Sequence, residues 1–538
     1  MCGTIARAYA PSVPAWYNDR RVRTQRCRKH SVNVWRPAPC RPMPNSPDAP
    51  TAGTTGLDIH CIAIGGTGMA PLACLLQALG HRVRGSDAPL YPPMSTLLAD
   101  AGIVPRVGFD PQHLEPVPDL VIVGNAVPRS NPQAEQVEAM GLPRVSMPQA
   151  IARFLLVGRA PLVVAGTHGK TTTTALASWV YERLGEQPGF LIGGVPIGLE
   201  RSFCLGRGRR FVIEGDEYNA AYFDRGAKFL HYRPQTLILT SAEYDHADLY
   251  PNHESLLAAF ERLVASVPPS GAIIACGDAP HVRSLLAAAR AEVITYGLGS
   301  SNRVCPLGAV ETDARGSHLR LDDGRGATLA LTVPIPGRHN VANALAVWAA
   351  ARRDGLDPAA VVAALGSFRG VRRRLEVLAE HAGITVVDDF AHHPTAVAAS
   401  LNGLAERFAG RRLIALFEPR SLTAGRALFL EAYVRAFAAA GGVILAPVFH
   451  RQRLGDQGLD LEQLAARLRT AGIEAVARAA GEDLLACALD RLVPGDVAVT
   501  MSSGAFGGLA ARLVAALERS EAEDHAMPAA ASRCSSTP

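Results

Sequence analysis

Residues 166–174 read GTHGKTTTT, a combination of glycine, lysine and threonine that could bind phosphate. The stretch follows a short apolar run and opens a predicted helix. Backbone N–H groups in a glycine-rich turn at a helix N-terminus point toward one place and favour an anion there. Lys170 would neutralise the β- and γ-phosphates of a nucleotide, and the Thr171 hydroxyl would ligate Mg²⁺. The predicted ATP-phosphate loop comprises Gly166, Thr167, His168, Gly169, Lys170, Thr171 and Thr172.

The lysine in this loop is rare for the chain. Of the 54 basic residues only three are lysines, namely Lys29, Lys170 and Lys228. Lysine therefore stands where a compact point charge is needed and a planar guanidinium would not serve. Val164 occupies the position where the usual phosphate-loop pattern has its first glycine. A strand-to-helix turn with a surface lysine is the alternative, and the flanking strand and helix favour the phosphate interpretation.

Two side chains that follow predicted strands could complete a metal shell with Thr171. Glu214 lies in RFVIEGDEY (210–218), and His246 lies in QTLILTSAEYDHADLY (235–250). An acid after a strand is more often a helix cap, and a histidine in such a turn is more often a structural hydrogen-bond partner. Their positions on parallel strands beside the phosphate loop favour a Mg²⁺ site of Thr171, Glu214 and His246.

A second glycine-rich turn occurs at residues 65–68. The sequence IGGTGM follows a predicted strand and opens a helix, and Asp87 follows about twenty residues later, as in the dinucleotide fingerprint. Pro71 stands where the third glycine is expected, so a different diphosphate, such as a UDP-sugar, suits this turn better. A purely structural strand-to-helix turn is an equally good interpretation of this motif alone.

Strand patterns alternate with helix patterns in three blocks, which predicts an α/β fold with parallel sheets. Ligands bind such sheets at the carboxyl ends of the strands. The most apolar stretch, 427–449, contains Glu431 and Arg435 and is predicted as a helix followed by a buried strand, not as a membrane span. The predicted blocks are 58–158, 159–369 and 370–518, between disordered tails at 1–57 and 519–538.

The net charge of +5 over 538 residues comes from the N-terminal tail. Residues 1–57 carry nine basic and two acidic residues, so the remainder has a net charge of about −2. We therefore expect no nucleic-acid surface. The arginine-rich tail loosely resembles a transit peptide, but a disordered extension or an early start codon is the simpler interpretation. The ten cysteines include no C-x-x-C pair, which indicates reduced thiols in a cytoplasmic protein, and we expect a monomer with no membrane association.

Five motifs together resemble the Mur ligase family. They are GTHGKTTTT, EGDEYN (214–219), PGRHNVANA (336–344), VRRRLEV (371–377) and DDFAHHPT (388–395). The resemblance covers about 58–518 and implies a Rossmann-like UDP-sugar domain, a P-loop ATPase central domain and a Rossmann-like C-terminal domain for the peptide substrate. Within the family, stretches such as FEPRS (417–421) resemble a ligase that adds the tripeptide L-Ala-γ-D-Glu-meso-diaminopimelate to UDP-N-acetylmuramic acid in peptidoglycan recycling. The ligase that adds L-alanine to the same sugar is the alternative.

The resemblance implies an ATP-dependent reaction that proceeds through an acyl phosphate. The muramic acid carboxylate attacks the γ-phosphorus and ADP leaves; the peptide amine then attacks the acyl carbon and phosphate leaves. In phosphoryl transfer the protein mainly positions groups and neutralises charge. A nucleotide-dependent oxidoreductase and a non-catalytic ATP-binding scaffold are the alternatives from other classes.

The resemblance also implies roles for individual residues. Lys170, His246, His392 and Arg374 would be catalytic. His339, Asn340, Arg374 and Asp389 would join the phosphate loop in binding ATP. Arg420 and Ser421 would bind the peptide, although a surface salt bridge is an equal alternative for Arg420. Gly65, Gly66, Thr67, Gly68, Asp87 and Asn125 would bind the UDP-sugar.

Two features depart from the family pattern. Some relatives hold metal ions with a carbamylated lysine, but residues 229–538 contain no lysine, so Glu261 is a weak candidate to replace it. Asn219 stands where an aspartate is expected after the EGDEY acids.

Overall fold

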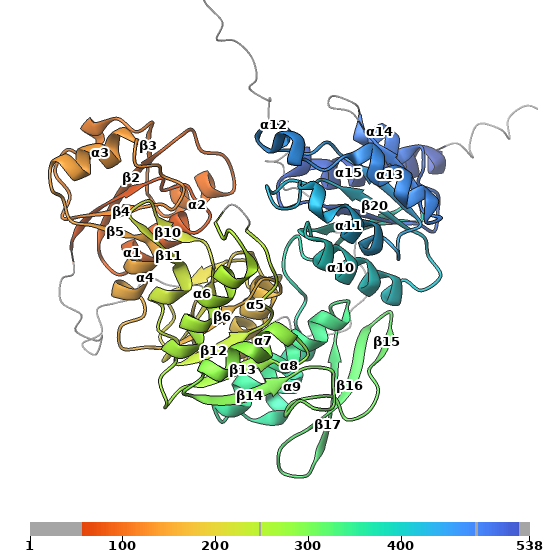
Figure 1. Cartoon of the computed structure of the whole chain (residues 1–538), viewed down its shortest axis with the longest axis horizontal. Coiled ribbons are helices and arrows are strands. Elements are labelled where there is room, and N and C mark those ends of the chain that lie inside the picture. The colour runs from red at the N-terminus through yellow and green to blue at the C-terminus, as the bar shows by residue number, and fades with distance from the viewer. Residues whose placement is uncertain (1–55, 247–248, 479–482, 527–538) are drawn as a thin grey trace, which may run out of the picture. The chain divides into compact units, whose positions relative to one another are not determined.

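A computed structural model describes residues 56–246, 249–478 and 483–526. The basic stretch 1–55 and the end of the predicted C-terminal tail, 527–538, lie outside the described residues. The described chain folds into successive α/β regions, each built on its own sheet (Figure 1). An α/β fold with largely parallel sheets is confirmed.

The N-terminal region is a five-stranded parallel sheet with helices. Its elements are β1 (Asp58–Ile62), α1 (Met69–Ala78), β2 (Arg82–Asp87), α2 (Met94–Asp100), β3 (Arg106–Val107), β4 (Leu120–Val123), α3 (Pro132–Ala139), β5 (Arg144–Ser146) and α4 (Met147–Phe154). The strand order is β3-β2-β1-β4-β5, and every pair is parallel. The order reverses between β1 and β4, which is where sheets of this kind bind ligands.

The central region has a seven-stranded sheet with the order β14-β13-β12-β6-β9-β7-β8. Its elements are β6 (Ala160–Ala165), α5 (Lys170–Arg183), β7 (Gly189–Leu191), β8 (Phe203–Cys204), β9 (Arg210–Gly215), β12 (Thr236–Leu239), α6 (His253–Ser266), β13 (Ala272–Cys276), α7 (Pro280–Leu285), β14 (Glu292–Tyr296), α8 (Arg338–Arg353) and α9 (Pro358–Gly366). Only β8 pairs antiparallel in this sheet. Two smaller sheets are formed by β10 (Asn219–Ala221) with β11 (Asp224–Ala227), and by β15 (Glu311–Asp313), β16 (Gly316–Asp322) and β17 (Thr328–Val333).

The C-terminal region has a six-stranded sheet with the order β18-β19-β23-β20-β21-β22, in which only β18 is antiparallel. Its elements are β18 (Glu376–His381), β19 (Ile384–Asp389), α10 (Pro394–Arg407), β20 (Leu413–Phe417), α11 (Leu430–Ala436), β21 (Gly442–Leu445), α12 (Arg451–Leu454), α13 (Leu461–Thr470), β22 (Glu474–Ala477), α14 (Leu484–Leu489), β23 (Val497–Met501) and α15 (Leu509–Ala526). The predicted helix and buried strand within 427–449 are confirmed as α11 and β21.

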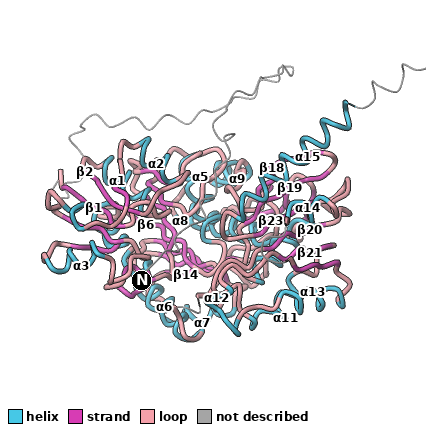
Figure 2. Tube along the Cα trace, turned by 90° about the horizontal axis from the view of Figure 1, so that it is seen from above, coloured by secondary structure: helices cyan, strands magenta, loops and turns pink. Residues whose placement is uncertain are grey.

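Alternation along the strands builds two cores in this region. Val387, Ala415 and Val499 pack with α10, α11 and α13, whereas Val386, Ile414 and Ala498 pack with α14 and α15. Successive side chains of a strand point to opposite faces, so apolar runs such as LIALF can bury both faces of a sheet. Figure 2 shows α15 on one side of these strands and α11 and α13 on the other.

Helix α15 continues to Ala526, so residues 519–526 are helical where the sequence predicts a disordered tail. The stretch RSEAEDHA contains arginine, glutamate and alanine, which favour helix, so the preceding turns propagate through it.

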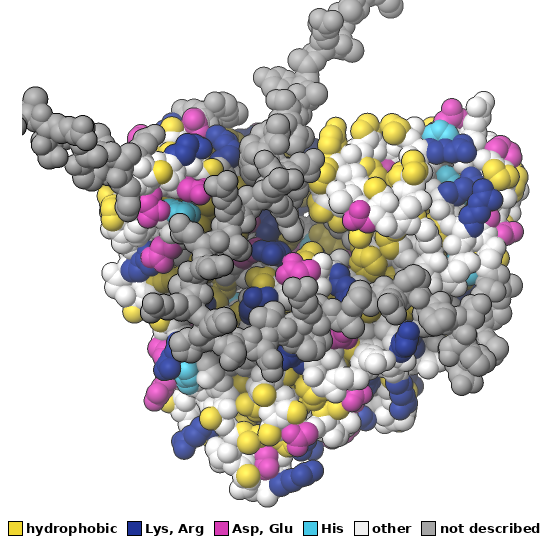
Figure 3. Space-filling model, turned by 180° about the vertical axis from the view of Figure 1, so that it is seen from behind, with side chains coloured by type: hydrophobic (Ala, Val, Ile, Leu, Met, Phe, Trp, Pro, Cys, Tyr) yellow, Lys and Arg dark blue, Asp and Glu magenta, His cyan; other side chains and the backbone are white. Residues whose placement is uncertain are grey.

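No helix among the described residues is long and apolar enough to cross a membrane. On the face that Figure 3 shows, basic and acidic side chains of the described residues are intermixed.

Candidate active site

The phosphate loop follows β6 at the centre of the largest sheet. Strands β12 and β9 pair with β6 on its two sides, both parallel; Glu214 lies in β9, and His246 lies in the loop that follows β12. Gly166 has a φ of 134°, and a side chain there would collide with the Thr240 hydroxyl. Gly169, with a φ of 80°, precedes the first residue of α5. These two glycines therefore permit the turn that aims backbone N–H groups at the carboxyl edge of the sheet.

Lys170 is held by a carboxylate that the sequence reasoning missed. Its Nζ donates to both oxygens of Glu217, at 3.1 and 2.9 Å, and to the carbonyl oxygen of Gly166 at 2.7 Å. Glu217 is only 1% exposed. Burial lowers the pKa of Lys170, but the charges of Glu217 and Asp216 outweigh it and raise the pKa overall. The lysine is therefore a fixed cation beside the phosphate loop.

Thr171, Glu214 and Arg374 form a chain of contacts at the start of α5. The Thr171 hydroxyl donates to Glu214 Oε2 at 3.3 Å, and Arg374 Nη2 donates to the Thr171 hydroxyl oxygen at 3.2 Å. The backbone N–H of Gly193 donates to the other oxygen of Glu214 at 2.8 Å. Burial and the nearby Asp216 raise the pKa of Glu214. The oxygen donors of Thr171 and Glu214 suit Mg²⁺, which prefers oxygen ligands.

His246 joins this group through Glu217. Its Nε2 lies 2.9 Å from Glu217 Oε1, and its ring lies 4.2 Å from the ring of Tyr218. The backbone of His246 has a φ of 55°, uncommon for a residue with a side chain. Burial lowers the pKa of His246, but Glu217 and Asp245 raise it overall. The histidine therefore belongs to a buried charge network with Lys170.

The C-terminal region contributes side chains that follow β19. Arg374 lies over the ring of Phe390 at 4.4 Å. The Asp389 carboxylate accepts hydrogen bonds from the Ser400 hydroxyl and from the N–H groups of Leu375 and Phe390. Asp389 thus fixes the backbone that carries Arg374, in addition to any contact with a nucleotide.

His392 and His339 are neutral at pH 7. Burial lowers the pKa of His392, whose Nδ1 lies 3.1 Å from the Phe390 carbonyl oxygen. Burial and the nearby His168 lower the pKa of His339 to about 4.

Asn340 donates to the Pro336 carbonyl oxygen at 2.7 Å, which fixes the turn before α8. Asn343, in the next turn of α8, lies against Gly169, so this helix end borders the phosphate loop.

The N-terminal turn is tied to β2 by Asp87. The Gly65 N–H donates to Asp87 Oδ2 at 2.7 Å, and a side chain at Gly65 would collide with Leu90. Gly66 and Thr67 are exposed, a side chain at Gly68 would press on Met147, and Asn125 is exposed just after β4. The turn thus lies at the reversal between β1 and β4.

Arg420 and Ser421 follow β20. Arg420 lies over the ring of Phe449 at 3.9 Å, and its Nη1 is 3.5 Å from Glu418 Oε2. The Ser421 hydroxyl oxygen accepts the N–H of Ala424 at 2.9 Å. Glu418 also accepts the Ser502 hydroxyl from beyond β23, so three loops at the carboxyl edge of this sheet meet near Arg420.

Three family models match successive parts of the chain. Residues 58–158 match the Mur ligase family, catalytic domain; residues 164–351 match the Mur ligase middle domain; residues 373–504 match the Mur ligase, glutamate ligase domain. The chain belongs to the Mur ligase family.

Known Mur ligases are similar to the chain over most of its length. The UDP-N-acetylmuramate–L-alanyl-γ-D-glutamyl-meso-2,6-diaminoheptandioate ligase of Escherichia coli (strain K12) is 40% identical over 469 residues, which cover 86% of this chain and 98% of that protein. The crystal structure of a murein peptide ligase from Psychrobacter arcticus 273-4 has a TM-score of 0.65 and 34% identity, and the match covers 86% of this chain and 99% of that one. The UDP-N-acetylmuramate-alanine ligase of Thermotoga maritima has a TM-score of 0.71 and 25% identity, with 86% and 100% covered.

The carboxylate partner of the Mur ligase lysine is the main residue that sequence reasoning missed. Glu261 is exposed on α6, whereas the buried Glu217 contacts both Lys170 and His246. Asn219 begins β10 and pairs with Ala227. The acids of EGDEYN were the available signal, but the sequence does not say which of them turns toward the lysine.

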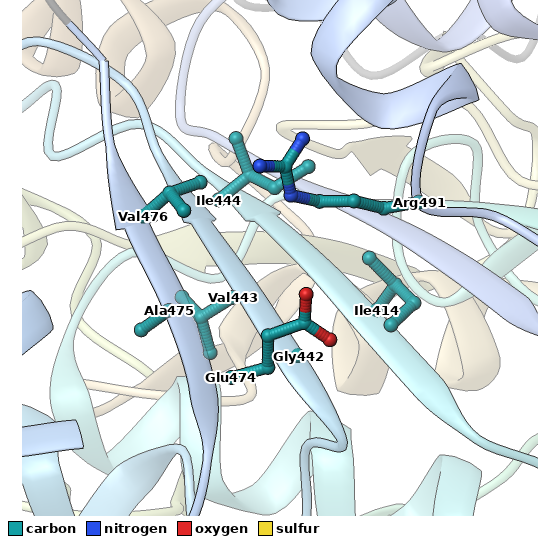
Figure 4. A pocket seen from close by; sticks show the side chains of 8 residues that line it. All are labelled: Ile414, Gly442, Val443, Ile444, Glu474, Ala475, Val476 and Arg491. Atoms are coloured by element: carbon teal, nitrogen blue, oxygen red, sulfur yellow. The ribbon is translucent and has the colours of Figure 1, made fainter. Parts of the chain in front are cut away.

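Two cavities in this Mur ligase lie away from these contacts. One, beside β20–β22, has a volume of about 10 Å³, room for about one water, and Figure 4 shows Glu474 and Arg491 among its lining side chains. The other, of about 520 Å³, is lined by α4 and by residues 230–233. Neither is lined by the phosphate-loop residues.

Proposed function

We propose that this Mur ligase joins the tripeptide L-Ala-γ-D-Glu-meso-diaminopimelate to UDP-N-acetylmuramic acid, in an ATP-dependent reaction that serves peptidoglycan recycling. The observation that carries the ligase chemistry is that Thr171 contacts both Glu214 and Arg374, next to Lys170 with its carboxylate partner Glu217. The choice of a tripeptide rests on the 40% identity to the Escherichia coli ligase named for that peptide.

Lys170 and Arg374 supply the positive charge that phosphoryl transfer requires. In this proposal Lys170 leaves part of its contact with Glu217 to bind the β- and γ-phosphates of ATP. Arg374 reaches the same phosphates from the C-terminal region. Thr171, Glu214 and His246 would hold Mg²⁺, which neutralises phosphate charge when it is bound. His246 holds Glu217 in place and so positions Lys170.

The substrates bind at the carboxyl ends of the sheets. The sugar carboxylate attacks the γ-phosphorus with ADP as the leaving group, and the peptide amine then attacks the acyl phosphate with release of phosphate. His392 is neutral at pH 7 because its pKa is lowered, so it can accept the proton that the amine loses. We assign the UDP-sugar to the 65–68 turn with Asp87 and Asn125, adenosine to His339, Asn340 and Asp389, and the peptide to Arg420 and Ser421.

The addition of L-alanine alone is the second candidate. The Thermotoga maritima structure named for that reaction has the higher TM-score of the two, 0.71 against 0.65. Purified protein with ATP, Mg²⁺ and UDP-N-acetylmuramic acid should release phosphate faster with the tripeptide than with L-alanine. Faster release with free L-alanine would overturn the tripeptide proposal and support the second candidate.

The proposal also includes a monomeric, cytoplasmic enzyme with domain limits near 58–158, 159–369 and 370–518. Light scattering of the purified chain tests the oligomeric state, and cell fractionation tests the location. Limited proteolysis tests the limits, because cleavage concentrates in exposed connections between compact regions.

A further inference from the structure

Three metal-ligating side chains meet where the phosphate loop approaches the start of α10. His168 belongs to the phosphate loop, Glu243 follows β12, and His393 precedes α10. Their ligating atoms all lie within 4.8 Å of one another, and His168 Nε2 is 3.4 Å from Glu243 Oε2. Among the described histidine, cysteine, aspartate and glutamate side chains, this is the one group of three or more with such spacing.

Three ring nitrogens of this cluster make no hydrogen bond. His393 is 7% exposed, yet neither of its ring nitrogens makes a hydrogen bond. His168 Nε2 also makes none, although its ring lies 5.0 Å from the ring of His393. Buried polar atoms in proteins are normally paired with protein, water or an ion. Three such ring nitrogens beside a carboxylate therefore indicate a ligand-binding group.

The donor set and spacing suit Zn²⁺. Zn²⁺ binds histidine nitrogen and carboxylate oxygen at about 2.0–2.2 Å in a tetrahedron, which separates neighbouring ligand atoms by about 3.3 Å. The contact of 3.4 Å between His168 and Glu243 meets that spacing, and all the ligating atoms lie within 4.8 Å of one another. Mg²⁺ prefers an oxygen shell, so two nitrogens favour the softer ion.

Two further features prepare the cluster for a metal. The Thr395 hydroxyl donates to Glu243 Oε2 at 2.7 Å, in the manner of an outer-shell partner that orients a ligating carboxylate. Burial and the nearby His168 lower the pKa of His393 to about 4. Burial raises the pKa of Glu243, but His168 and Thr395 lower it to about 2 overall. Both groups are thus in their metal-binding forms at neutral pH.

We propose that His168, Glu243 and His393 bind a Zn²⁺ ion, with a water molecule as the fourth ligand. The ligands differ from Thr171, Glu214 and His246, which we assign to Mg²⁺, so the two ions would not compete for the same side chains. Because the Zn²⁺ ligands come from the phosphate loop and from the turn before α10, a bound ion ties these two segments together. This inference does not depend on which peptide the enzyme uses.

The test is direct metal binding by the full chain. Protein stripped of metal with a chelator is titrated with Zn²⁺ in competition with a chromophoric chelator, and with Co²⁺, whose visible spectrum reports tetrahedral nitrogen and oxygen ligands. Variants Glu243→Gln and His393→Ala each remove one ligand. Thr395→Val removes only the outer hydroxyl. His381→Ala is the matched control. His381 ends β18 and also contacts a glutamate, Glu521.

Wild type and His381→Ala should bind one Zn²⁺ equivalent that Glu243→Gln and His393→Ala lose. Thr395→Val should weaken that affinity by about tenfold. Excess Mg²⁺ should leave Zn²⁺ binding unchanged. Equal Zn²⁺ affinity in wild type and Glu243→Gln, or displacement of Zn²⁺ by Mg²⁺, would overturn the proposal. Circular dichroism checks the fold of each variant, and Glu243→Gln, which keeps the side-chain shape, decides the matter if His393→Ala fails to fold.

Discussion

Two histidine–glutamate contacts border the phosphate loop, and they differ in how well their polar atoms are paired. His246 lies 2.9 Å from Glu217, which also accepts from Lys170. His168 lies 3.4 Å from Glu243 without a hydrogen bond, and the neighbouring His393 has two unpaired nitrogens. The first contact belongs to a hydrogen-bonded network, whereas the second leaves ring nitrogens without hydrogen bonds.

The difference follows from where the residues come from. Lys170, Glu217 and His246 all belong to the central region, where they follow the neighbouring strands β6, β9 and β12 of one sheet. His393 comes from the C-terminal region and meets a loop of the central one. Satisfied buried networks rigidify a site, whereas unsatisfied groups are costly unless something binds them. The comparison assigns positioning to the first contact and ligand binding to the second.

Substitution of Lys170 tests the satisfied network most severely. Lys170→Ala removes the cation that we assign to the phosphates and should lower kcat by about 10²–10³-fold, as the loss of one charge-stabilising donor does in other enzymes. Lys170→Arg should also lose activity, because a planar guanidinium does not replace a compact ammonium. Phosphate release measures both, with circular dichroism as the check on folding. Wild-type turnover in either variant would remove Lys170 from the mechanism.

Lowering the pH should reduce the folding stability that depends on neutral His393. His393 has a folded pKa of about 4 against an ordinary value of 6.5. As pH falls from 6.5 to 4, the unfolded chain binds a proton that folded His393 refuses, so stability that is present above pH 6.5 is lost. The loss attributable to His393 is about 3 kcal/mol at most.

The corresponding measurement is urea unfolding of wild type and His393→Gln near pH 7 and near pH 4. The variant should lose less stability on acidification, and His381→Gln should behave as wild type does. Other histidines with lowered pKa values, such as His60 and His339, remain in both proteins and cancel in the comparison. An identical acid loss in His393→Gln would show that this histidine is not buried in a neutral form.

Glu217→Gln tests whether the satisfied network depends on charge. Glu217 and Asp245 raise the pKa of His246, so protonated His246 contributes stability that is full below pH 6.5 and is lost as pH rises through the folded pKa. The amide variant removes the negative charge beside His246 and should therefore lower that pKa. An NMR titration of the histidine ring measures the shift. Glu292→Gln, which affects a surface pair with Arg303, is the control and should leave His246 unchanged.

Much of the phosphate loop and of the network around Lys170 could be predicted from the sequence. The phosphate loop, its lysine and the positions of Glu214 and His246 beside it follow from motif chemistry and from the parallel order of strands. Glu217 could not be selected, because Glu214, Asp216 and Glu217 stand within four residues and lie at or beyond the end of β9. Which acid reaches the lysine depends on how the chain turns after Gly215.

The cluster of His168, Glu243 and His393 could not be predicted from the sequence. Sequence reasoning assigned His168 to the phosphate loop and selected His392, but its neighbour His393 is the histidine beside His168. Adjacent residues before a helix point in different directions, and which one faces another region depends on packing between sheets. Glu243 lies 150 residues from His393 in the chain, so no local pattern links them.

The smallest effect is expected from Thr395→Val. This change removes the hydroxyl that contacts Glu243 and leaves the three proposed Zn²⁺ ligands in place. The exposed hydroxyl bond to Glu243 should be worth about 1 kcal/mol or less without metal. Thr470→Val, which removes an exposed hydroxyl bond to Ala466, is a matched control. Zn²⁺ at 100 times the wild-type Kd should add about 2.7 kcal/mol to wild type, but about 1.4 kcal/mol to a variant that binds tenfold more weakly. The gap between wild type and Thr395→Val in urea unfolding should therefore widen when Zn²⁺ is added, while the gap for Thr470→Val stays constant. A gap that does not change with Zn²⁺ would mean that Thr395 supports only the contact between the two segments and orients no metal ligand.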